Sequence, residues 1–71
     1  MTASEIDEAL IANVGQRWRK VAMVLALAAE QLASDNFDLL AERLQLLVAG
    51  GQLEAQGDLS RWRHSEVRLA A

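Results

Sequence analysis

The single histidine of the chain, His64, is the side chain best suited to acid–base chemistry at neutral pH. Its neighbour Ser65 would point to the opposite face of an extended strand, so the two cannot form a nucleophile–base pair. Ser60 could approach His64 across a loop, but the sequence places no third group to orient the imidazole ring. We therefore expect His64 to be a surface residue, and we expect the chain not to be an enzyme.

Metal and phosphate sites have little support in the sequence. The chain has no Cys, and one His among scattered carboxylates matches no zinc-ligand spacing. In residues 35–38, Phe37 takes the third position, where a calcium loop needs an oxygen ligand. The glycines lie in neither a Lys-Ser/Thr phosphate loop nor a GxGxxG run. We predict no metal, no cofactor and no small-molecule ligand.

Two clusters place basic residues around a tryptophan. The first surrounds Trp18 and the second surrounds Trp62. Arginine beside an aromatic ring can stack on bases or enter a minor groove. We favour a simpler interpretation, in which Trp18 is a core residue and the arginines are solvated. Trp62 either folds back onto the body or serves as an exposed interface anchor. The candidate contact residues of this second cluster are Arg61, Trp62, Arg63 and His64.

Length and composition point to one small folded domain over residues 1–71. Hydrophobic residues make up 52% of the chain, which excludes a disordered tail. The net charge is −3, from 7 basic and 10 acidic residues. The longest apolar run, residues 21–29, is far shorter than the ~20 residues that span a bilayer. The acidic N-terminus does not fit a signal peptide, so we expect a cytoplasmic protein with no membrane contact.

Three helices are predicted, over about residues 5–14, 17–32 and 36–49. Capping-box patterns at Thr2 and at Ser4 fit the start of the first helix, and Gly15 is expected to end it in a left-handed conformation. Ser34 or Asp35 is expected to cap the third helix. The predicted core face of the second helix comprises Trp18, Val21, Leu25, Ala28, Ala29 and Leu32.

The end of the chain is predicted to form a two-stranded β wing over about residues 53–69. One strand is expected at 53–56 and the return strand at 63–69, joined by a loop at 57–62. Val67 and Leu69 alternate with Glu66 and Arg68, which is the period of a half-buried strand. The fold class is therefore mainly α with a β wing, an α+β arrangement.

The order of three helices and a hairpin resembles a winged helix-turn-helix domain. At the junction 44–54, two leucines seat the third helix and a glycine turns the chain into the wing. More specifically, the chain resembles a winged-helix-like domain of unknown function from uncharacterised bacterial proteins. The segments that carry this resemblance are Trp18–Ala22, Gly51–Leu59 and Ser65–Leu69. That domain usually closes a longer chain and implies no established activity.

A DNA-reading role is disfavoured by the charge of the third helix. Affinity for DNA depends on neutralising phosphates with Lys and Arg. The third helix offers Arg43 alone, against Asp35, Asp38 and Glu42. The alternative function is nucleic-acid binding through the basic wing and the residues 17–20 at the start of the second helix.

Protein association is the function that we predict from the sequence. Met23, Val24 and Leu27 lie opposite the core face of the second helix, and Leu39 and Leu46 lie opposite that of the third. These apolar residues exceed what a three-helix core can bury, and exposed apolar patches usually mark interfaces. We expect an interaction or regulatory module that forms a homodimer or binds a partner domain. The predicted interface comprises Met23, Leu27, Leu39, Glu42 and Leu46.

Overall fold

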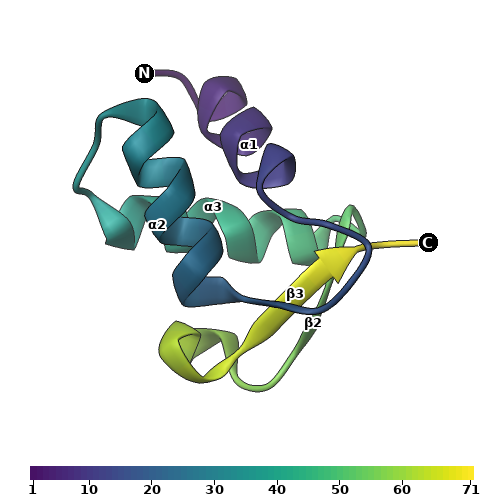
Figure 1. Ribbon diagram of the computed structural model, residues 1–71. Coiled ribbons are helices and arrows are strands. Elements are labelled where there is room, and N and C mark those ends of the chain that lie inside the picture. The colour runs from purple at the N-terminus through teal and green to yellow at the C-terminus, as the bar shows by residue number, and fades with distance from the viewer.

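The computed structural model describes residues 1–71 as an α+β fold with a three-stranded antiparallel sheet (Figure 1). The strand order in the sheet is β1-β3-β2. The elements are α1 (Ala3–Ala12), β1 (Arg19–Lys20), α2 (Val21–Leu32), α3 (Phe37–Ala49), β2 (Leu53–Gln56), the 3₁₀ helix η1 (Leu59–His64) and β3 (Glu66–Leu69). No helix is long and apolar enough to cross a bilayer.

The first helix begins earlier than predicted because Thr2 caps it. The Thr2 hydroxyl accepts from the Glu5 amide at 3.1 Å, and the Thr2 amide donates to the Glu5 carboxylate at 3.3 Å. This reciprocal pair is the first of the two predicted capping boxes. The helix ends before Asn13, whose side-chain amide donates to the carbonyl of Ala9. Gly15 does not have the predicted left-handed conformation. Its carbonyl accepts a hydrogen bond from the Leu69 amide.

The second helix starts at Val21, later than predicted, because residues 19–20 join the sheet. Arg19 lies opposite Val67 and Lys20 opposite Glu66, and the Val21 amide donates to the Ser65 carbonyl at 3.0 Å. The placement of Trp18 on the core face of this helix was therefore wrong. Trp18 precedes β1, is half-buried, and has the guanidinium of Arg68 4.3 Å from its ring centroid.

The core is built mainly from the three α-helices, and Leu53 and Val67 extend it to the sheet. Its largest fully buried side chains include Leu10, Leu25, Leu40 and Leu44. Val24 is also fully buried, so its predicted position on an outer face was wrong. The reason is that α2 packs against α1, α3 and η1, which together cover more than one side of it.

Asn36, rather than Ser34 or Asp35, caps the third helix, and its side chain accepts from the Leu39 amide. The first wing strand, β2, has the predicted bounds, whereas β3 begins at Glu66 because the preceding residues form η1. At the start of η1, the Asp58 carboxylate accepts from both the amide and the hydroxyl of Ser60. The segment predicted as a loop is thus largely part of a 3₁₀ helix, which packs against α2.

Candidate functional site

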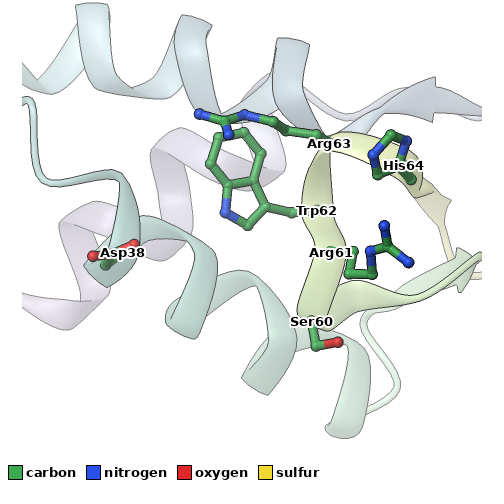
Figure 2. Close-up of a pocket in the computed structure, with 6 residues that line it drawn as sticks. All are labelled: Asp38, Ser60, Arg61, Trp62, Arg63 and His64. Carbon is green, nitrogen blue, oxygen red and sulfur yellow. The ribbon is translucent and has the colours of Figure 1, made fainter.

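The four predicted contact residues of the wing line one hollow beside α3. This hollow, called the η1 hollow below, has a volume of about 370 Å³. Figure 2 shows Trp62 directed toward α3, with the side chain of Arg63 lying along its ring. Arg61 and His64 project to the other side of the η1 backbone. The lining residues are Asp38, Ser60, Arg61, Trp62, Arg63 and His64.

Trp62 folds back onto the body of the domain, which is one of the two positions expected for it. Its ring stacks on Phe37, with centroids 6.3 Å apart and planes 12° apart. The guanidinium of Arg63 lies 4.9 Å from the Trp62 ring centroid, within the range of a cation–π contact. The Gln45 side chain also donates to the Leu59 carbonyl at 3.2 Å. These contacts attach η1 to the start and the middle of α3.

The β1–β3 pairing brings Lys20 beside η1, although the two lie far apart in the chain. Lys20, Arg63 and His64 line a second hollow of about 320 Å³ together with Ser65 and Glu66. Of the seven basic residues, only Arg43 and Arg68 form ion pairs, which leaves five without a carboxylate partner. Two unpaired cations, Arg63 and Lys20, thus share one surface with His64. No sequence pattern indicates this proximity, because a two-residue strand shows no periodicity.

The outward side of α3 is acidic at one end and apolar at the other. Asp38, Glu42 and Leu46 are spaced by four residues, so they form one exposed stripe. Arg43 instead turns toward α1, where its Nε and Nη2 donate to the Asp7 carboxylate at 3.0 and 2.8 Å. This hydrogen-bonded contact with Asp7 raises the pKa of Arg43. The only cation of α3 is therefore used inside the molecule.

The residues of the predicted apolar interface differ in their exposure. Met23 and Leu46 are 51% and 50% exposed, and Leu27 is 38% exposed. Leu39 is half-buried and packs against the core, so it does not project outward as the helical spacing had indicated. Glu42 is exposed. The apolar exposure is thus divided between α2 and the C-terminal half of α3.

His64 has no hydrogen bond to either neighbouring serine. The Ser65 hydroxyl is buried and donates to the Trp62 carbonyl at 3.2 Å. The Ser60 hydroxyl donates to Asp58 at 2.6 Å, a contact that lowers the pKa of the Asp58 carboxyl. The structure contains no group of three His, Cys, Asp or Glu residues that could hold a metal ion. The arrangement offers charge and shape for binding, without a nucleophile–base pair.

Comparisons with family models, curated proteins and solved structures found no match to this chain. Its function is therefore inferred from the geometry described above.

Proposed function

We propose that this chain is a winged-helix-like module that acts by binding protein, as a homodimer or with a partner domain. The element order α1-β1-α2-α3-β2-β3 supports the winged-helix assignment, with α2 and α3 as the helix-turn-helix and β2-η1-β3 as the wing. The short strand β1 strengthens this assignment, because it adds a third strand to the sheet beside the hairpin.

The surface of α3 is the observation that carries the protein-binding proposal. In a helix-turn-helix domain the second helix of the motif reads the major groove, and it needs donors on its outer face. Here that face presents Asp38, Glu42 and Leu46, while Arg43 is paired with Asp7. Two acidic side chains would repel the phosphates of DNA. Covering a half-exposed leucine with a protein surface is favourable, because it removes apolar area from water.

A leucine-to-glutamate substitution at Leu46 tests the proposal. Full burial of a leucine side chain is worth about 1.5–3 kcal/mol, and a charge in its place would oppose association. We expect Leu46→Glu to dissociate the assembly in analytical ultracentrifugation while circular dichroism stays unchanged. Gln52→Glu, an equal change of charge at an exposed position outside α3, is the control. An assembly that survives Leu46→Glu would contradict the use of this face.

A second candidate function is nucleic-acid binding through the wing and β1. The observation in its favour is that Lys20, Arg63 and His64 line a hollow without any hydrophobic residue. For nucleic-acid binding, the logarithm of the binding constant should fall with the logarithm of the salt concentration, with a slope of about −0.9 per neutralised phosphate on a duplex. Binding of a random-sequence duplex that is lost in Lys20→Glu/Arg63→Glu would favour this second candidate.

A further inference from the structure

We propose that the partner is a second copy of this chain, docked on the face that α3 and η1 form together. In this dimer, Asp38 of each copy pairs with Arg61 of the other, and the two pairs fix the register of the interface. The inference rests on the proposed function, since it names the partner and the surface of the same protein-binding module.

The η1 hollow has one acidic side chain, Asp38, and its basic side chains include Arg63, which lies along the Trp62 ring between the two sides. Figure 2 shows Asp38 on one side of Trp62 and Arg61 with His64 on the other. A two-fold axis that passes near Trp62 exchanges these sides, so the acidic wall of one copy meets the basic wall of the other. Such an interface is isologous, because one patch is complementary to itself.

Both charges are free to make this contact. Asp38 and Arg61 are exposed, and neither forms an ion pair within the chain. The carboxylate closest to Arg61 in sequence, Asp58, accepts two hydrogen bonds from Ser60, and it attracts Arg61 without forming an ion pair with it. Pairing across the axis would therefore break no ion pair of the monomer.

Leu46 supplies the apolar part of the same face. It lies eight residues after Asp38 on the exposed stripe of α3, a rise of about 12 Å along the helix. An interface of standard size covers about 800 Å² per partner, which is about a fifth of the 4457 Å² surface of this chain. A face that includes α3 and η1 can thus bury Leu46 while the charge pairs set the orientation.

Charge reversal with complementation tests the proposal in the full chain. We expect Asp38→Lys and Arg61→Glu each to weaken self-association by about tenfold or more, because attraction becomes repulsion at two symmetric positions. An equimolar mixture of the two variants should restore association. In the mixed dimer, the lysine introduced at position 38 faces the glutamate introduced at position 61, and the second pair keeps its original residues. Glu30→Lys and Arg17→Glu make the same charge changes at exposed positions outside this face and should have no effect.

The outcomes separate this inference from the proposed function. A wild-type dimer whose affinity is unchanged by both reversals would overturn the charge-paired register and leave protein binding intact. A wild type that stays monomeric at about 100 μM would overturn the second copy as the partner. Weakening in both variants without restoration in the mixture would also contradict the reciprocal pairing.

Discussion

At the scale of single residues, the backbone at position 57 requires a glycine. Its φ is +86°, and a Cβ added there would lie 2.8 Å from the His64 carbonyl oxygen. We predict that Gly57→Ala destabilises the fold by about 1–3 kcal/mol, because it adds both a left-handed strain and a steric contact. Chemical denaturation measures the change.

Gly15 provides the matched control. A Cβ at that position meets nothing within 4 Å, and its φ is not in the left-handed region. Gly15→Ala should therefore change the free energy of unfolding by no more than about 1 kcal/mol. Equal losses in the two variants would contradict the special role of Gly57.

The carboxylates of Glu54 in β2 and of Asp58 at the start of η1 make stability depend on pH. The hydrogen bond and charge of Arg68 hold the pKa of Glu54 below its ordinary value of 4.5, and Ser60 holds that of Asp58 below 3.8. A carboxyl whose pKa is lower in the folded state stabilises the fold above its unfolded pKa and loses this effect as the pH falls. We expect Tm to fall as the pH drops from about 5 through the folded pKa values. Thermal unfolding of Glu54→Gln should show a shallower acid dependence, and an unchanged profile would contradict the contribution of Glu54.

At the scale of elements, Trp62 attaches η1 to the helices. We predict that Trp62→Ala destabilises the fold by about 1–3 kcal/mol, less than for a fully buried tryptophan because Trp62 is half-buried. Hydrogen exchange should become faster in residues 59–64, whereas the amides of α1 should keep their protection. Trp62→Phe retains an aromatic ring against Phe37 and should lose less. Uniform loss of protection along the chain would contradict a local attachment.

The elements also show what the sequence could predict. The three helices and the strand Leu53–Gln56 were predicted from periodicity and from the glycines after α3. Their bounds were confirmed within a few residues, except at the start of α2. The strand β1 could not be predicted, because two residues carry no period and depend on the edge of β3. The helix η1 places Trp62 against Phe37, a contact that no local pattern indicates.

The same limit applies to the candidate site. The residues 61–64 could be selected from their types, since arginines and a histidine surround a tryptophan. Their neighbours Asp38 and Lys20 could not, because tertiary packing and strand pairing bring them there. Helical spacing placed Leu46 outward correctly, but it failed for Leu39 and Val24, since packing from several sides covers more than one face of a helix.

At the scale of the whole molecule, one small core carries the stability. A domain of 71 residues is expected to have a free energy of unfolding of about 4–10 kcal/mol. We predict that Leu44→Ala, at a fully buried core position, removes about 2–5 kcal/mol of this. Leu46→Ala, on the exposed side of the same helix, should cost less than about 1 kcal/mol at a concentration where the chain is monomeric. Denaturant titration of the two variants compares them directly.

Self-association of the whole chain is tested most directly by sedimentation equilibrium of the wild type, up to about 100 μM. We predict a species of twice the 7.8 kDa chain mass at low salt. This species should weaken at about 1 M salt, because salt screens the charge pairs. A single species of 7.8 kDa over the whole concentration range would contradict self-association.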